Sequence, residues 1–164
     1  MSDQALETAV YTQLISTLQN THFHEDDARL MAGECAAVIA IEWGDLKRAS
    51  LDSGYEYKTL AERAEVVKFC QQFSAHAELE PGNSIAREYL AEFPVLHWKH
   101  LVIAKGLKDP AKAKVALERA VKDGMTVPQF GRFVRRMKKA LGHAQGKIVI
   151  DNGRGLRVTI ERYE

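Results

Sequence analysis

The most chemically distinctive stretch of the chain is TVPQFGRFVRRMKK, at positions 126–139. It contains five basic residues, two phenylalanines and no acid. Its apolar residues recur at steps of three and four, and so do its polar ones, which predicts an amphipathic helix with one cationic side. A row of cations about one helical turn apart suits the phosphates of a duplex, and arginine or glutamine can also bind base edges. The stretch therefore predicts contact with nucleic acid.

The residues of this predicted helix divide between two opposite sides. The side expected to face the core consists of Val127, Phe130, Val134, Met137 and Leu141. The side expected to contact DNA consists of Gln129, Arg132, Arg135, Arg136 and Lys139. A solvated surface helix is the alternative interpretation. Such helices usually carry i,i+4 pairs of opposite charge, and no acid is present here to form them.

A second cationic element is predicted downstream of this helix. KIVI and LRVTIERY alternate apolar and polar residues on either side of DNGRG, which is typical of a β-hairpin. Arg154 would lie at its tip, with Lys147 and Arg157 beside it. Helix, turn, helix and hairpin is the order of a winged helix, in which the second helix enters the major groove and the wing contacts phosphate or the minor groove. A purely structural hairpin is the alternative.

The net charge of +1 conceals a strong division along the chain. Residues 1–93 hold 7 basic and 16 acidic residues, a balance of −9, whereas residues 94–164 hold 16 and 6, a balance of +10. Charge asymmetry of this size indicates a basic part that meets a polyanion. The alternative is that the two halves attract each other. The Pro-Gly stretch ELEPGNS, which begins at position 78, is the best candidate for a linker between them.

Helical periodicity extends over most of the chain before the hairpin. Helices are predicted at 4–19, from the acids near 25–27 to about residue 45 or on toward 51, at 57–73, 84–93, from Pro94 to 105, and at 110–123. We therefore predict a mainly α fold, with an N-terminal helical bundle followed by a C-terminal winged helix-turn-helix with a β-hairpin. The expected domains are an acidic one at 1–80, for dimerisation or partner binding, and a basic one at 83–164.

No residue pattern indicates an enzyme. His22 and His24 beside three acids, or His97 and His100 three apart, could share a metal. Helix capping and solvation explain the first pair more simply, and packing or phosphate contact explains the second. The chain has no catalytic triad order, phosphate-binding loop or zinc spacing. We expect no catalytic activity, metal or cofactor.

The sequence also bears on the compartment. No apolar run approaches the roughly 20 residues that cross a bilayer, and the first residues lack the pattern of a secretory signal. Cys35 and Cys70 form neither a metal-binding spacing nor a disulfide framework and fall at apolar helical positions. We expect two buried free thiols in a soluble, cytoplasmic protein without membrane contact.

Residues 97–139 resemble the helical DNA-binding region of ParB-type plasmid partition proteins and related plasmid and phage proteins. There, a helix with a histidine near its start precedes a helix opened by Asp-Pro, and a short turn leads into a basic helix. The matching pieces are His97, Asp109-Pro110 and KDGMTVPQFGRFVRR. The resemblance implies a DNA-associated helical module. It does not extend to partition activity or CTP hydrolysis, because no ParB-like nucleotide-binding boxes lie upstream.

Two functions follow from these observations. The first is a protein that binds duplex DNA through the basic helix and the hairpin, as a transcriptional regulator or a plasmid or phage accessory factor. The second is an adaptor or inhibitor of plasmid or phage type, whose basic face docks on an acidic protein surface.

Overall fold

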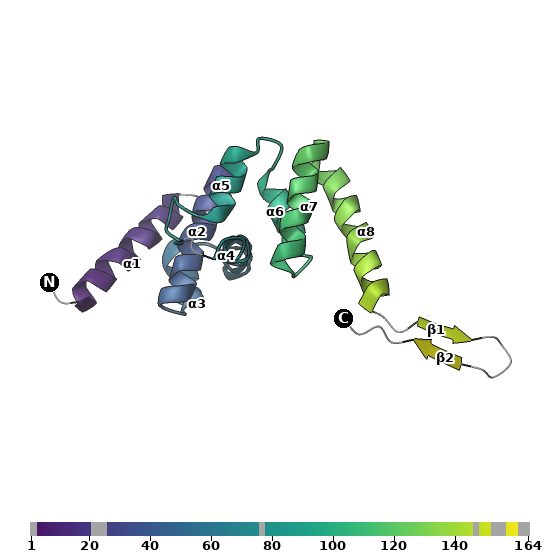
Figure 1. The fold of residues 1–164 in the computed structure, drawn as a ribbon. Coiled ribbons are helices and arrows are strands. Elements are labelled where there is room, and N and C mark those ends of the chain that lie inside the picture. The colour runs from purple at the N-terminus through teal and green to yellow at the C-terminus, as the bar shows by residue number, and fades with distance from the viewer. Residues whose placement is uncertain (1–2, 21–25, 76–77, 146–147, 152–156, 161–164) are drawn as a thin grey trace.

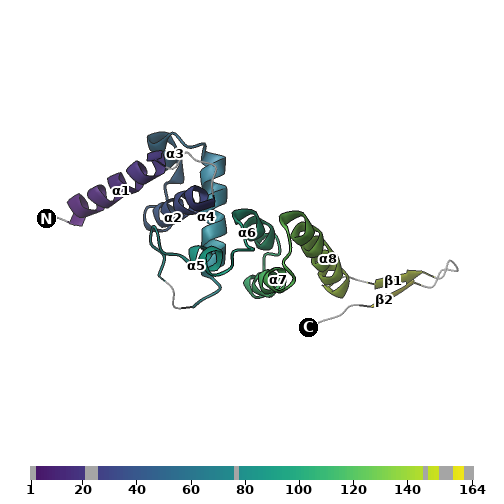
Figure 2. The ribbon, with the colours of Figure 1, turned by 90° about the horizontal axis from the view of Figure 1, so that it is seen from above.

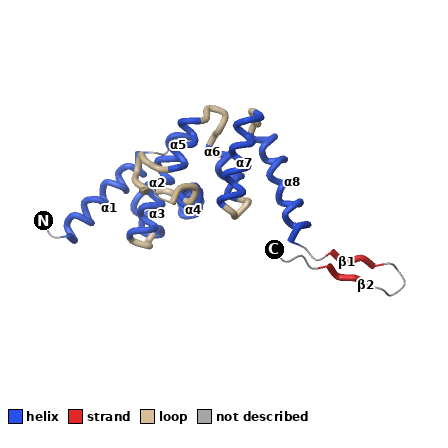
Figure 3. The backbone as a smooth tube through the Cα atoms, in the orientation of Figure 1, coloured by secondary structure: helices blue, strands red, loops and turns tan. Residues whose placement is uncertain are grey.

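The computed structural model describes all residues except 1–2, 21–25, 76–77, 146–147, 152–156 and 161–164. Within this part the chain forms helices that follow one another from one end of the molecule to the other, and a short hairpin after the last helix (Figures 1 and 3). The elements are α1 (Asp3–Asn20), α2 (Asp26–Glu42), α3 (Leu46–Ser53), α4 (Tyr57–Gln71), α5 (Ile85–Glu92), α6 (Trp98–Lys105), α7 (Pro110–Asp123), α8 (Val127–Gln145), β1 (Ile148–Asp151) and β2 (Arg157–Ile160).

Helices α2 and α4 form the centre of the N-terminal part. The buried side of α2 consists largely of alanine and glycine, which lets α4 approach closely. At Gly33 a β-carbon would lie 2.8 Å from Val67 Cγ2 and 2.9 Å from the Arg63 carbonyl oxygen, so the two helices leave room only for glycine. Trp98 of α6 reaches the same point, where its ring would be 3.3 Å from that β-carbon.

The boundary between α2 and α3 settles which of the two predicted ends is right. The chain turns at Gly44, whose φ is +66°, and the Asp45 side chain then accepts the Arg48 backbone N–H at 3.1 Å as the N-cap of α3. The end near residue 45 is therefore confirmed, and continuation of one helix toward residue 51 is wrong. The predicted helix start at Pro94 is also wrong. A turn follows Pro94, and α6 begins only after its N-cap residue, His97.

One hydrophobic core extends from α1 to α8. Its buried members include Leu18 of α1, Leu60 of α4, Leu101 of α6 and Phe130 of α8, all fully inaccessible to solvent. No helix in the described part of the chain has both the length and the apolarity needed to span a bilayer.

The two cysteines belong to this core. Cys35 and Cys70 are both free and buried, which confirms the prediction for these residues. Burial raises the pKa of each thiol to about 12, so both stay protonated at neutral pH.

A buried ion pair joins α2 to α5. Glu34 is inaccessible to solvent, and its carboxylate accepts hydrogen bonds from Arg87 Nη2 at 2.6 Å and from Arg87 Nε at 3.2 Å. The Gly82 backbone N–H also donates to this carboxylate at 3.3 Å, and Arg87 Nη1 contacts Asp27 at 3.0 Å. The hydrogen bonds with Glu34 raise the pKa of the Arg87 guanidinium. Helix α5 and the loop before it are thus tied to α2 through a few specific groups.

The predicted winged helix-turn-helix is wrong, although the chain is mainly α. Strands β1 and β2 pair antiparallel, with Ile148 opposite Ile160. They lie beyond the C-terminal end of α8, away from α6 and α7, and contact chiefly each other (Figures 1 and 2). A wing packs beside the helix that it accompanies. Here α8 continues about one turn past Leu141, which packs against the core, and so carries the strands away from the helical core.

Candidate nucleic-acid interface

Three helices position the predicted DNA-contacting side chains. Helix α6 contacts both α7 and α8 (Figure 2). Helix α7 has the predicted start and stop: Asp109 accepts the Ala111 backbone N–H at 2.9 Å, Pro110 occupies the first position, and Gly124 ends the helix with φ of +60°. A left-handed φ is easily adopted only by glycine. The chain can therefore turn within three residues and enter α8.

The buried side chain of His100 stabilises this turn. Its ring is fully buried and lies 5.4 Å from the Phe130 ring, centroid to centroid. Nδ1 accepts the His97 backbone N–H at 3.0 Å, so the proton resides on Nε2, which donates to the Met125 carbonyl at 3.0 Å. Burial lowers the pKa of His100 and favours the neutral ring. Both ring nitrogens are engaged, so His100 has none left for a metal shared with His97.

Four of the five residues predicted for the apolar side of α8 pack in or against the core, whereas Val127 is half-buried and is not among the core residues. Phe130 and Val134 are 0% and 2% exposed, and Met137 and Leu141 are half-buried against the core. Phe133, which was not in the predicted set, also packs there. Because this side is held by α6, the orientation of the opposite side is fixed as well.

The solvent-facing surface of α8 presents five exposed cations. They are Arg132, Arg135, Arg136, Lys138 and Lys139. None of them forms an ion pair with a carboxylate in the described part of the chain. Together they line one shallow depression of about 530 Å³. The Arg135 guanidinium is held in place at its inner end, where Nε donates to the Gly131 carbonyl at 3.3 Å. We call these five side chains the cationic row.

Lys138 was missing from the predicted contacts. It lies over the C-terminal end of α6, where a β-carbon added to Gly106 would be 2.9 Å from Lys138 Nζ. A helix C-terminus carries partial negative charge and favours a nearby cation. In the sequence, Lys138 follows Arg135 by about one helical turn in a stretch without acids, and this spacing could have identified it as a further contact.

Gln129 has a different role from the predicted one. Its Oε1 accepts the Thr126 backbone N–H at 2.9 Å, while Thr126 Oγ1 accepts the Gln129 backbone N–H at 3.4 Å. This reciprocal pair is a capping box at the start of α8. Reading adenine bidentately requires both the oxygen and the nitrogen of the amide. Gln129 cannot do so while its oxygen caps the helix.

No described contact joins the cationic row to the hairpin residues that we predicted as DNA contacts. Lys147 and Arg154 lie outside the described residues. Arg157 is the first residue of β2, paired with Asp151 across the hairpin.

No protein-family model, curated protein or solved structure matches the chain. The resemblance of residues 97–139 to ParB-type proteins therefore stays a prediction, and the function must be argued from the geometry of the site.

Proposed function

We propose that the protein binds double-stranded DNA through the cationic row of α8. One observation carries the proposal: five exposed basic side chains lie together on a rigidly packed helix without a carboxylate partner in the described part of the chain. Several surface cations elsewhere in the described part of the chain do have such partners. Arg119, for example, contacts Asp123 at 2.6 Å. A concentration of unpaired cations favours a polyanionic ligand.

The phosphate backbone is the part of DNA that this surface fits best. Arginine and lysine both neutralise phosphates, and such contacts supply affinity without sequence information. Gln129, the amide that could have read adenine, caps α8 instead. The protein would therefore bind many duplex sequences, as a regulator or accessory factor whose placement on DNA depends on more than this helix.

The dependence of affinity on salt tests the proposal. If all five cations contact phosphate, affinity falls by about 500-fold between 50 and 200 mM salt, because each contact contributes about 0.9 to the logarithmic slope. Replacing both Arg132 and Arg136 with glutamine should reduce the slope by about 1.8. Fluorescence anisotropy with a labelled random duplex measures both quantities.

Two exposed lysines of the N-terminal part provide the matched control. The double variant Lys47→Gln, Lys58→Gln removes the same charge from the protein but leaves α8 intact, so its slope should equal that of the wild type. A slope unchanged by the Arg132 and Arg136 substitutions, or reduced equally by the lysine control, would refute the proposal. Such a result would favour docking of the basic face on an acidic protein.

A further inference from the structure

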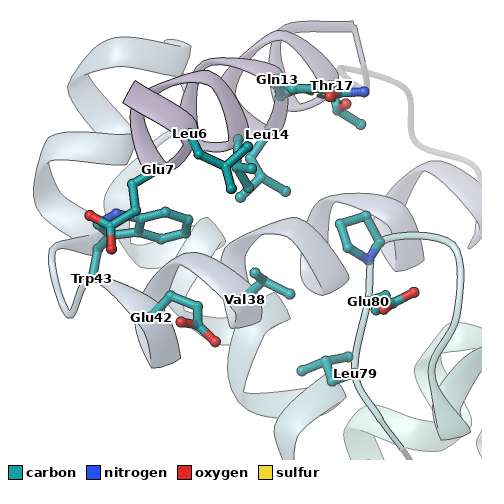
Figure 4. A pocket seen from close by; sticks show the side chains of 12 residues that line it. Leu6, Glu7, Gln13, Leu14, Thr17, Val38, Glu42, Trp43, Leu79 and Glu80 are labelled. Atoms are coloured by element: carbon teal, nitrogen blue, oxygen red, sulfur yellow. Dashed lines mark hydrogen bonds between the residues drawn. The ribbon is translucent and has the colours of Figure 1, made fainter. Parts of the chain in front are cut away.

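A groove lies between α1, α2 and the loop before α5, far from the cationic row. It has a volume of about 640 Å³. An adjoining hollow of about 330 Å³ shares Val38, Glu42, Leu79 and Glu80 with it, so the two form one continuous groove. Leu6 and Leu14 of α1 project into this space opposite Val38 of α2 (Figure 4). We call it the α1–α2 groove.

The groove is lined along most of α1. Its lining residues on that helix run from Leu6 to Thr17, which corresponds to about 16 Å, or about three helical turns. A three-turn apolar groove is the size that an amphipathic helix fills with anchors at i, i+3 or i+4, and i+7.

Apolar side chains in and beside the groove remain open to solvent. Leu6 is 54% exposed, Val10 is 43% exposed, and Ile41 on the far wall is 59% exposed. Leu6, Val10 and Leu14 follow one another at steps of four, so they form a single stripe along α1. Leu6 and Val10 are the exposed part of this stripe, whereas Leu14 is buried, and exposed apolar side chains beside an apolar groove favour a surface that another chain covers.

Carboxylates surround the apolar floor. Glu7, Glu42, Glu78 and Glu80 all line the groove, and all are exposed. None forms an ion pair with a cation in the described part of the chain. Figure 4 shows Glu7 and Glu42 near Trp43 at one end and Glu80 on the loop. The rim is therefore negative, and among the described residues no basic one lines either hollow.

We propose that the α1–α2 groove binds a basic amphipathic helix of a partner protein. Its apolar side would cover Leu6, Val10 and Val38, while its lysines or arginines would meet the acidic rim. A second copy of this chain fits less well. A two-fold interface brings the same patch of each copy together, and the four glutamates would then face four others. Helix α8 of another copy is basic, but its apolar side is already packed in the core.

A synthetic helix provides the probe. A fluorescein-labelled peptide of about 14 residues, with leucines at i, i+4, i+7 and i+11 in a lysine and alanine background, has the proposed chemistry. Titration with the full chain at 150 mM salt should give saturable binding. A scrambled peptide of the same composition lacks the apolar stripe and should bind at least about tenfold more weakly.

Substitutions then locate the binding site. Val10→Asp places a carboxylate against the leucines of the peptide and should weaken binding at least about tenfold. Leu51→Asp is the matched control, because Leu51 is 85% exposed on α3 and does not line the groove. Thermal unfolding of both variants confirms that these exposed positions leave the fold intact. Reversing the rim charge with Glu42→Lys and Glu80→Lys should also weaken binding.

Three results would overturn the proposal. The first is that the scrambled peptide binds as tightly as the designed one, and the second is that the Val10→Asp protein binds the designed peptide as tightly as the wild type does. The third is that the protein forms a dimer in solution that Val10→Asp dissociates, which would identify a second copy as the occupant. The Arg132 and Arg136 variant should keep wild-type affinity for the peptide, so failure of the DNA proposal is distinguishable from failure of this one.

Discussion

Removal of the Arg87 side chain should strongly destabilise the protein. In Arg87→Ala, the fully buried carboxylate of Glu34 loses all its hydrogen bonds to the guanidinium, including those of 2.6 and 3.2 Å, and keeps only the 3.3 Å bond from the Gly82 backbone. Breaking a buried pair in this way costs about 3–5 kcal/mol. For a chain of this length, that corresponds to a fall of about 6–20 °C in the melting temperature.

The origin of this cost can be tested with a second substitution. Glu34→Gln alone should destabilise the protein, because the guanidinium loses its anionic partner. In the Arg87→Ala background the same substitution should stabilise it, because it removes the stranded buried charge. The sign of the Glu34→Gln effect should therefore reverse between the two backgrounds. Urea denaturation of the four proteins gives the complete cycle.

The pair formed by Arg119 and Asp123 provides the control. Its closest approach is also 2.6 Å, but its side chains are 55% and 37% exposed. Arg119→Ala should change the free energy of unfolding by less than about 1 kcal/mol. If Arg87→Ala costs no more than Arg119→Ala, or if Glu34→Gln is destabilising in both backgrounds, the argument that burial makes the Glu34 pair important is refuted.

Two further predictions concern the start of α8. The lowered pKa of His100 means that the folded state resists protonation, so stability should fall as the pH drops below about 6.5, where the unfolded histidine takes up a proton. His100→Gln should flatten that part of the pH–stability curve in urea titrations, and an unchanged slope would assign it to other groups. Gln129→Ala should lower stability by about 1 kcal/mol through loss of the capping box, yet leave the salt slope of DNA binding unchanged. A lower slope would show that Gln129 leaves Thr126 to contact DNA.

Helix boundaries set by neighbouring residues were predictable from the sequence. Asp109-Pro110 and Gly124 mark α7 because a cap, a fixed φ and a left-handed turn each depend on one or two residues. The apolar side of α8 followed from spacing alone. The same local signals also show why Gln129 was misassigned: a capping box reads Thr-x-x-Gln, and that pattern is present from Thr126.

Long-range partners could not be predicted in this way. Glu34 and Arg87 lie 53 residues apart, and the Asp26 carboxylate accepts the Trp98 backbone N–H from 72 residues away. No periodicity relates such positions, so a buried glutamate in α2 looked like any other acid. The prediction of a wing was wrong for a similar reason. Alternation can indicate strands, but it does not say which surface the strands pack against.

The division of charge along the chain has two separate consequences. Part of the acidic charge is neutralised within residues 1–93, where Asp27 and Glu34 of α2 contact Arg87, and the Asp26 carboxylate accepts the Trp98 backbone N–H at the start of α6. Of these contacts, those of Asp26 join residues 1–93 to residues 94–164, and attraction between the two halves as a whole stays a prediction. Within the described residues, however, these contacts involve neither the cationic row nor the rim of the α1–α2 groove. Figure 1 places α1 and α8 at opposite ends of the molecule. Surfaces of opposite charge at opposite ends do not compete for a ligand, so DNA on α8 and a basic helix on α1 could be held at the same time.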